Sequence, residues 1–179
     1  MSLYDDAVAA LTRWPAPNAE QDHLRTAYLV HLAEHRDGLT RDCNPDHLTA
    51  SALVVSESRD RVLLNLHGKY EIWVQFGGHC EPEDTRMHEA ALREAVEESG
   101  VDGLRLVSDL PTQLSTHEVR CGPVRPSHHL DVRYVAVAPD DAVSRVSEES
   151  LDVAWFAPDA LPDGLDAPLR ELITWALAT

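Results

Sequence analysis

Apolar positions recur at helical spacing in four parts of the chain. In the second of these parts Leu24, Tyr28 and Leu32 recur every four residues, which places their side chains on one face of a helix. The stretch "WPAPN", residues 14–18, interrupts the pattern and separates this part from the first. The pattern predicts helices over residues 3–13, 19–35, 86–99 and 167–178.

Much of the chain between residues 47 and 157 shows the shorter apolar runs that are typical of β-strands. The predicted strands cover residues 48–56, 61–67, 71–76, 104–110, 114–120, 130–138 and 152–157. Because strands surround a central helix and another helix closes the chain, we predict an α/β fold with a mixed β-sheet between helical layers. We expect residues 1–44 to form an N-terminal helical extension and residues 45–179 to form the main domain.

Charge narrows the range of partners. The chain carries 15 Lys and Arg against 31 Asp and Glu, a net charge of −16. Such a surface repels a phosphate backbone, so a nucleic-acid polymer is not an expected partner. A small anionic substrate remains compatible with this charge, since a bound metal inverts the field locally.

Cysteine usage and hydropathy indicate the compartment. Three cysteines, Cys43, Cys80 and Cys121, are too few and too widely spaced for a disulfide framework. The first residues lack the basic and apolar segments of a signal peptide, and no stretch approaches 18 apolar residues. We therefore expect a cytoplasmic protein with reduced thiols and no membrane association.

The helix over 86–99 carries an unusual concentration of negative charge. Glu94, Glu97 and Glu98 lie at i, i+3 and i+4, on one face and within one turn. Like charges at this spacing oppose the helix by a few tenths of a kcal/mol per pair, so a positive partner is expected. Arg93 adjoins them, and clustered carboxylate oxygens favour Mg²⁺ or Mn²⁺ over a soft metal.

The residues before and within this helix form a recognisable motif, "GGHCEPEDTRMHEAALREAVEESGV", residues 77–101. It resembles the Nudix box, G-x5-E-x7-R-E-U-x-E-E-x-G-U with U apolar. Gly78 matches the leading glycine, and residues 93–101 match every fixed position. Asp84 stands where the first glutamate belongs, and eight residues rather than seven separate it from Arg93. Phe76 precedes the glycine pair where many members have proline.

The resemblance implies a Nudix-like α/β/α sandwich that hydrolyses a nucleoside diphosphate linked to another moiety. It implies that Glu94, Glu97 and Glu98 are metal ligands and act in catalysis, with a backbone carbonyl near Gly78 as a further ligand. Arg93 would orient the glutamates. The implied cofactor is Mg²⁺ or Mn²⁺, which would polarise the diphosphate and help to generate a hydroxide nucleophile.

The general base is open between a box glutamate and a glutamate from a later loop. Glu148 and Glu149, in "VSEESLDVAWF", are the late candidates, and Glu149 is the one we include among the catalytic residues. Two other functions remain open on the same fold. One is a catalytically silent sensor that binds a nucleotide, and the other is an isomerase of isoprenyl diphosphates.

Several side chains outside the box are candidates for contact with a small anionic nucleotide-like substrate. Trp73 is placed to stack on a base, with a core position as the alternative. His128 and His129 precede a strand that borders the expected cleft. The pairs His79-Cys80 and His128-His129 are candidate zinc ligands, but their spacings fit no closed structural zinc site. His117 is a candidate base or substrate contact, with a place on a strand surface as the alternative. The N-terminal helices are expected either to cover the sheet or to form a homodimer contact.

Overall fold

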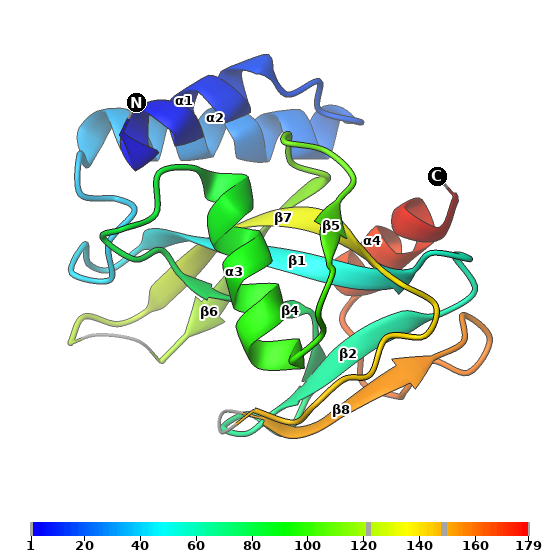
Figure 1. Cartoon of the computed structure of the whole chain (residues 1–179). Helices are drawn as coiled ribbons and strands as arrows, with labels where there is room; N and C mark the ends of the chain where they lie inside the picture. Colours follow the sequence, from blue (N-terminus) through cyan, green and yellow to red (C-terminus); the bar gives the residue numbers. More distant parts are fainter. Residues whose placement is uncertain (1, 121–122, 148–149, 179) are drawn as a thin grey trace.

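A computed structural model describes residues 2–120, 123–147 and 150–178. Two helices come first in the chain, and each of the two later helices follows a run of four strands (Figure 1); the sheet lies between helical layers. The helices are α1 (Leu3–Arg13), α2 (Ala19–Glu34), α3 (Met87–Ser99) and α4 (Ala167–Ala178). The strands are β1 (His47–Ser56), β2 (Val62–His67), β3 (Trp73–Val74), β4 (Phe76–His79), β5 (Arg105–Leu106), β6 (Gln113–Val119), β7 (Ser127–Ala138) and β8 (Ser150–Phe156).

The parallel pair β1 and β7 forms the centre of the sheet, with ten residue pairs from His47–His129 to Ser56–Ala138. Along its other edge β1 pairs first with β4 and then with β2. In the same way β7 pairs first with β6 and then with β5. The sheet therefore divides into two parts, one with β4 and β6 and one with β2 and β5.

Alternate residues of the central strands point to opposite faces of the sheet, and different helices cover the two faces. Leu48, Ala50 and Ala52 of β1 face the core that contains α1, α2 and α3, whereas Leu53 and Val55 face the core beneath α4. Successive side chains of a strand point to opposite faces, so the two cores lie on opposite sides of the sheet. The predicted α/β fold with a mixed sheet between helical layers is confirmed.

The helix ends follow from local chemistry. Ser2 caps α1 in a capping box with Asp5, as the sequence predicts for a serine at this position. Gly100 ends α3 with a φ of 62°, a left-handed conformation that glycine adopts without a Cβ clash. The bounds of α1 and α4 agree with the predicted helices, and α2 and α3 each differ by one residue.

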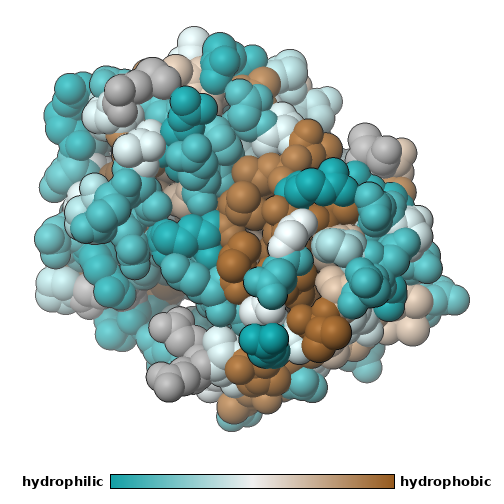
Figure 2. Space-filling view, in the orientation of Figure 1, coloured by the Kyte–Doolittle hydropathy of each residue, from teal (hydrophilic) through white to brown (hydrophobic). Residues whose placement is uncertain are grey.

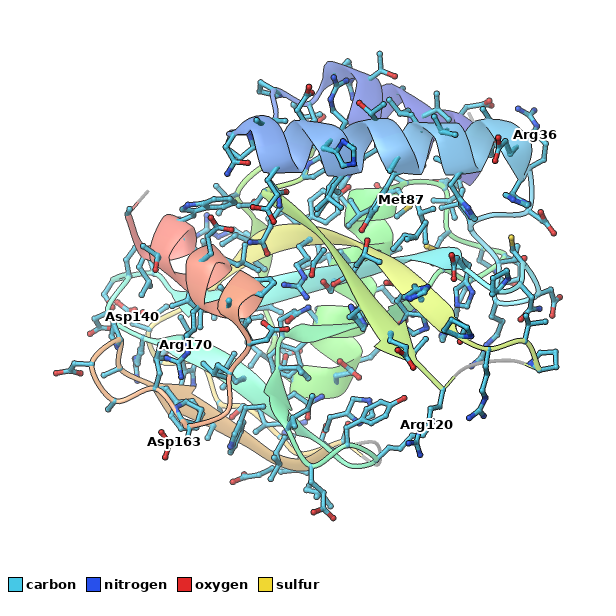
Figure 3. All side chains as sticks on the ribbon, turned by 180° about the vertical axis from the view of Figure 1, so that it is seen from behind. Arg36, Met87, Arg120, Asp140, Asp163 and Arg170 are labelled. Carbon is cyan, nitrogen blue, oxygen red and sulfur yellow. The ribbon has the colours of Figure 1, made fainter. Side chains whose placement is uncertain are left out.

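The N-terminal helices are bound to the rest of the molecule through buried polar contacts. The carboxylate of Asp6 in α1 accepts the backbone N–H of Met87, the first residue of α3, at 2.9 Å. Figure 3 shows Met87 where α3 meets the N-terminal helices. Gln21 of α2 bonds both the N–H and the C=O of Leu114 in β6. These contacts fix α3 and β6 relative to α1 and α2.

Two predicted strands are wrong in their extent. The strand over 71–76 is replaced by β3 and β4, because Glu71 adopts a φ of 55° and ends the preceding turn. Gln75 separates the two short strands and turns its amide toward Ser51 and Asp131. The strand over 104–110 is reduced to Arg105–Leu106, which pairs with β7 for two residues.

Candidate functional site

Arg93 holds the loop before α3 against the helix. Its Nε and Nη2 donate to Oδ1 and Oδ2 of Asp84 at 3.2 and 3.0 Å, a bidentate pairing. The side chain of Asp84 is only 9% exposed and also accepts the N–H of Glu81. Arg93 Nη2 makes a further contact with the carbonyl of His79 at 3.3 Å. Asp84 therefore pairs with Arg93 despite the extra residue before α3.

The same guanidinium compensates the acidic turn of α3. Arg93 Nη1 donates to Glu94 Oε1 and to Glu97 Oε2, both at 3.0 Å. The hydrogen bond to Asp84, together with the neighbouring carboxylates, raises the pKa of Arg93 above its usual value. Burial works to raise the pKa of Asp84, but bonds from Arg93 and from the Glu81 N–H outweigh it and lower that pKa below 3.8. Arg93 and Asp84 are therefore both charged at neutral pH.

Two glutamates of α3 reach the glycine pair in β4. Glu98 Oε2 accepts the N–H of Gly77 at 2.9 Å. The carboxylate of Glu94 lies so close to Gly78 that a Cβ added there would come within 2.8 Å of Glu94 Oε2. At Gly77 an added Cβ would instead meet Ser51 Cβ at 2.3 Å. The two glycines thus face different neighbours: a Cβ at Gly78 would meet the movable carboxylate of Glu94, and a Cβ at Gly77 would meet β1 itself.

The donors at this point fit a hard divalent cation. Glu94 and Glu98 offer carboxylate oxygens, and the backbone of Gly78 offers a carbonyl, with no sulfur or imidazole among the three. Glu97 bonds Arg93 as Glu94 does, but its side chain is 58% exposed, against 15% for Glu94. Of the three predicted carboxylate ligands, the structure brings Glu94 and Glu98 to the glycine pair and leaves Glu97 beside Arg93.

A polar layer lies on the far side of β4, along the first halves of β1 and β7. Asp131 and Arg133 are 2% and 3% exposed and form an ion pair at 2.9 Å. Ser51 donates to the same Asp131 carboxylate at 2.8 Å, and Gln113 accepts from Arg133 at 3.1 Å. Sequence reasoning missed these residues, although polar residues at alternate positions of an apolar strand were a usable signal.

Four histidines continue this layer. His47, His79 and His129 come from β1, β4 and β7, and their ring centroids lie 4.9 to 5.0 Å apart. His117 of β6 packs against His129 at 5.4 Å. Burial lowers the pKa of all four rings, that of His79 to about 4 and that of His129 to about 3. The rings are therefore uncharged at neutral pH.

The other candidates from the sequence are placed as follows. His128 points to the opposite face of β7 from His129, and its Nδ1 lies 3.0 Å from Asp46 Oδ1. Trp73 packs edge-on against Phe156 beside the α4 core, which favours the core position over base stacking. Burial raises the pKa of Cys80 to about 12, so this thiol is protonated. Glu148 and Glu149 lie outside the described residues.

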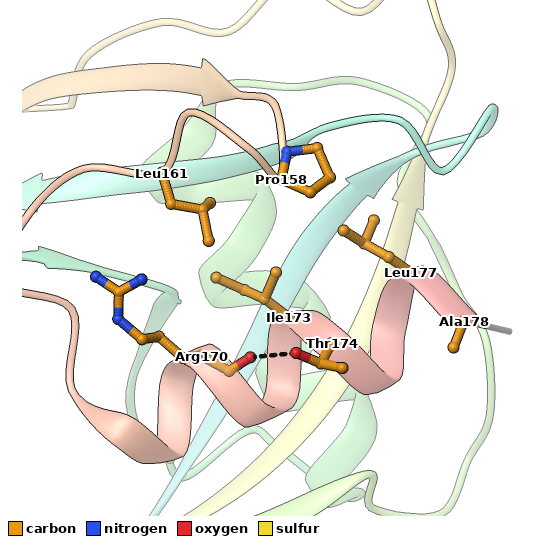
Figure 4. A pocket seen from close by; sticks show the side chains of 7 residues that line it. All are labelled: Pro158, Leu161, Arg170, Ile173, Thr174, Leu177 and Ala178. Atoms are coloured by element: carbon orange, nitrogen blue, oxygen red, sulfur yellow. Dashed lines mark hydrogen bonds between the residues drawn. The ribbon is translucent and has the colours of Figure 1, made fainter.

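Two surface hollows lie away from the glutamates of α3. Figure 4 shows one of about 470 Å³ formed by α4 and the segment after β8, lined by Leu161, Ile173 and Leu177 among others. On the face shown in Figure 2, hydrophilic side chains cover α3, and hydrophobic ones gather beside it around β5. Val107, which is 48% exposed, lines a second hollow there. The polar chemistry is therefore concentrated at α3, β4 and the histidine layer.

The fold and the site together define a class of protein. It is an α/β/α protein in which a loop and a helix present arginine-held carboxylates to a glycine pair at the sheet. The family model described as NUDIX domain matches residues 45–176. The chain belongs to the Nudix family, and the resemblance seen in the box is confirmed.

Solved structures agree with this assignment. A NUDIX-family hydrolase from Clostridium perfringens is 24% identical with a TM-score of 0.62, over 74% of this chain and 96% of that one. The dihydroneopterin triphosphate pyrophosphohydrolase of E. coli is 19% identical with a TM-score of 0.60, over 73% and 94%. The NUDIX domain of Shewanella oneidensis NrtR, solved with ADP ribose, is 17% identical with a TM-score of 0.54, over 82% and 95%. These similarities support the fold.

No curated protein matches the chain. Family membership makes the protein a Nudix-type hydrolase, as the sequence predicts. None of the helices in the described ranges has the length and apolar character that crossing a membrane requires.

Proposed function

We propose that this protein hydrolyses the diphosphate linkage of a nucleoside diphosphate joined to another moiety and requires Mg²⁺ or Mn²⁺. The family assignment supports the reaction class. Two structural neighbours support the substrate class by name, since one is a pyrophosphohydrolase of a pterin triphosphate and one is in complex with ADP ribose. Because the chain carries a net charge of −16, a bound cation would reverse the local field and allow such an anion to bind.

Glu94, Glu98 and the Gly78 carbonyl are the proposed metal ligands. The observation that carries this proposal is the convergence of both carboxylates on one glycine pair, with Glu98 bonded to the Gly77 N–H. Glu97 stays a predicted ligand, and one of its oxygens, Oε2, is bonded to Arg93. When bound, the metal supplies charge neutralisation of the diphosphate and lowers the pKa of a bound water.

The chain's own residues supply position and proton transfer. Arg93 fixes the loop through Asp84 and orients Glu94 by a bond at 3.0 Å. The general base is proposed to be a box glutamate or Glu149. The base accepts a proton from the attacking water and then releases it to solvent. His128 and His129 are the proposed substrate contacts outside the box. Because they point to opposite faces of β7, only one of them can contact a substrate bound at the α3 carboxylates. Trp73 is assigned to the packing of the α4 core rather than to substrate binding.

A substrate panel tests the proposal. Purified protein is incubated with ADP ribose, dinucleoside polyphosphates, nucleotide sugars, nucleoside triphosphates and an isoprenyl diphosphate, with Mg²⁺ or with EDTA, and the products are separated by chromatography. We expect cleavage of a diphosphate bond in at least one nucleotide, with release of a nucleoside phosphate and loss of activity in EDTA. Nucleotide binding without turnover would support a silent sensor, and a rearranged isoprenyl diphosphate would support an isomerase.

A further inference from the structure

Three neighbouring strands bring three imidazoles together behind the glycine pair. His47, His79 and His129 each offer a ring nitrogen, and these nitrogens all lie within 4.8 Å of one another. The closest pair is His47 Nε2 and His79 Nε2 at 3.0 Å. The three residues are distant in sequence, so only the pairing of β1 with both β4 and β7 gathers them.

The hydrogen bonds of His47 prepare its Nε2 as a ligand. Its Nδ1 lies 3.2 Å from the carbonyl oxygen of Cys43, which can only accept, so Nδ1 carries the proton. In the neutral ring Nε2 then has no proton and accepts the hydrogen bond that His79 Nε2–H donates at 3.0 Å. A metal ion would replace this bond, and His79 Nε2 would lose its proton on binding. Metal-binding histidines commonly donate their second ring N–H to a backbone carbonyl in this way.

His129 provides a second indication of a ligand. Its Nε2 is buried without a hydrogen-bond partner among the described residues, although a buried polar atom normally has one. A metal ion shared with its two neighbours would satisfy this nitrogen. His117 Nδ1, in the ring that packs against His129, is likewise buried without a partner within the described ranges.

We propose that His47, His79 and His129 bind one transition-metal ion of the Zn²⁺ type, at a site separate from the carboxylates of α3. Neutral imidazoles suit Zn²⁺, Cu²⁺ or Ni²⁺ and are poor ligands for Mg²⁺. Zn–N bonds of about 2.0 to 2.1 Å in a tetrahedron place ligand nitrogens roughly 3.3 Å apart. The closest pair of the cluster already lies near that separation, and the third nitrogen lies within reach of a rotamer adjustment.

The two sites use opposite faces of β4. Gly78 faces α3 and Glu94, and the next residue, His79, faces the polar layer. Three protein ligands leave a fourth position of a tetrahedral ion for water or an anionic oxygen. The histidine site therefore takes a different metal from the carboxylate site, and its occupancy does not depend on the proposed hydrolase reaction.

Zinc titration of the metal-free protein tests the proposal. Protein is treated with chelator, the chelator is removed, and Zn²⁺ affinity is measured by competition with a chromophoric chelator in wild type, His79→Ala and His129→Ala. We expect one tight equivalent in wild type and at least tenfold weaker binding in each variant. Cobalt substituted for zinc should give the intense visible bands of a four-coordinate ion in wild type and lose them in both variants.

Two controls separate the outcomes. His23→Ala removes an exposed histidine of α2 and should leave zinc affinity unchanged. Glu98→Gln alters the carboxylate site and should also leave it unchanged, whereas loss of zinc binding in Glu98→Gln with retention in His129→Ala overturns the proposal. Circular dichroism checks that each variant is folded. If one of the two alanine variants unfolds, the zinc affinity of the other tests the proposal. Equal zinc affinity in wild type and in a folded His129→Ala protein also overturns it.

Discussion

The pairing of Asp84 with Arg93 can be tested by Asp84→Asn, which keeps the shape of the side chain and removes its charge. In wild type, Asp84 Oδ2 accepts from both Arg93 Nη2 and the Glu81 N–H. Asp84 Oδ1 accepts from Arg93 Nε. An asparagine amide has one acceptor oxygen, so its NH₂ group must face either Arg93 Nε or the two donors at the Oδ2 position. The variant therefore loses at least one charge-assisted bond in a position where Asp84 is 9% exposed.

The size of the loss follows from the partners that Arg93 keeps. A hydrogen bond to a charged group contributes about 1.5 to 3 kcal/mol. Arg93 is 22% exposed and retains Glu94, Glu97 and the His79 carbonyl, so solvent and the remaining partners reduce the expected loss to about 1 to 2 kcal/mol. For a chain of this size that corresponds to a fall in melting temperature of roughly 2 to 8 °C.

Chemical denaturation in EDTA measures this loss without a contribution from metal. Glu81→Gln is the matched control, because Glu81 lies 3.8 Å from Arg93, is 57% exposed and should contribute about 0.5 kcal/mol or less. The pKa of Asp84 is lowered by folding, so its contribution is present above pH 3.8 and declines as the pH falls through the folded-state pKa. The difference between wild type and Asp84→Asn should therefore be constant between pH 5 and 7 and narrow only in stronger acid. An Asp84→Asn protein as stable as Glu81→Gln at pH 7 would refute the pairing as a source of stability.

Three further substitutions test other parts of the structure. Gly78→Ala should weaken Mg²⁺ binding with little loss of stability, because its Cβ displaces only the end of the flexible Glu94 side chain; isothermal titration and melting measure both. Gly77→Ala should unfold or strongly destabilise the protein, since its Cβ meets β1, and a soluble variant with a wild-type melting temperature contradicts this. Gln21→Ala should lower the free energy of unfolding by about 2 to 3 kcal/mol, because it leaves the buried N–H and C=O of Leu114 unpaired. A loss below about 0.5 kcal/mol in urea denaturation would mean that this contact of α2 contributes little to stability.

Periodicity predicted most of the fold because the decisive interactions are local. The helix over 86–99 could be located from its apolar spacing and its terminal glycine, and Gly100 does adopt the left-handed conformation. The strand over 71–76 failed because the positive φ at Glu71 leaves no mark in the pattern of apolar residues. Gln75, between the two short strands, donates to Asp131, a partner 56 residues away that the local pattern does not reveal.

The candidate site was predictable to the extent that it lies in one segment. Glu94 and Glu98 lie four residues apart on one helix, and the glycine pair precedes them within the same box. The role of Asp84 could not be read from the sequence, since the extra residue before α3 obscured its reach to Arg93. The histidine cluster depends on the pairing of β1 with β4 and β7, which no local spacing encodes.

The most direct test of the account compares Glu98→Gln with Glu97→Gln on a hydrolysed nucleotide at saturating Mg²⁺. Glu98 reaches the glycine pair, whereas Glu97 lies exposed beside Arg93. The account predicts that turnover of Glu98→Gln falls by at least about 10²-fold, that Glu97→Gln falls less, and that EDTA abolishes wild-type turnover. Near-normal turnover of Glu98→Gln, or full activity of metal-free wild type, would contradict a metal centre formed by α3 and the glycine pair.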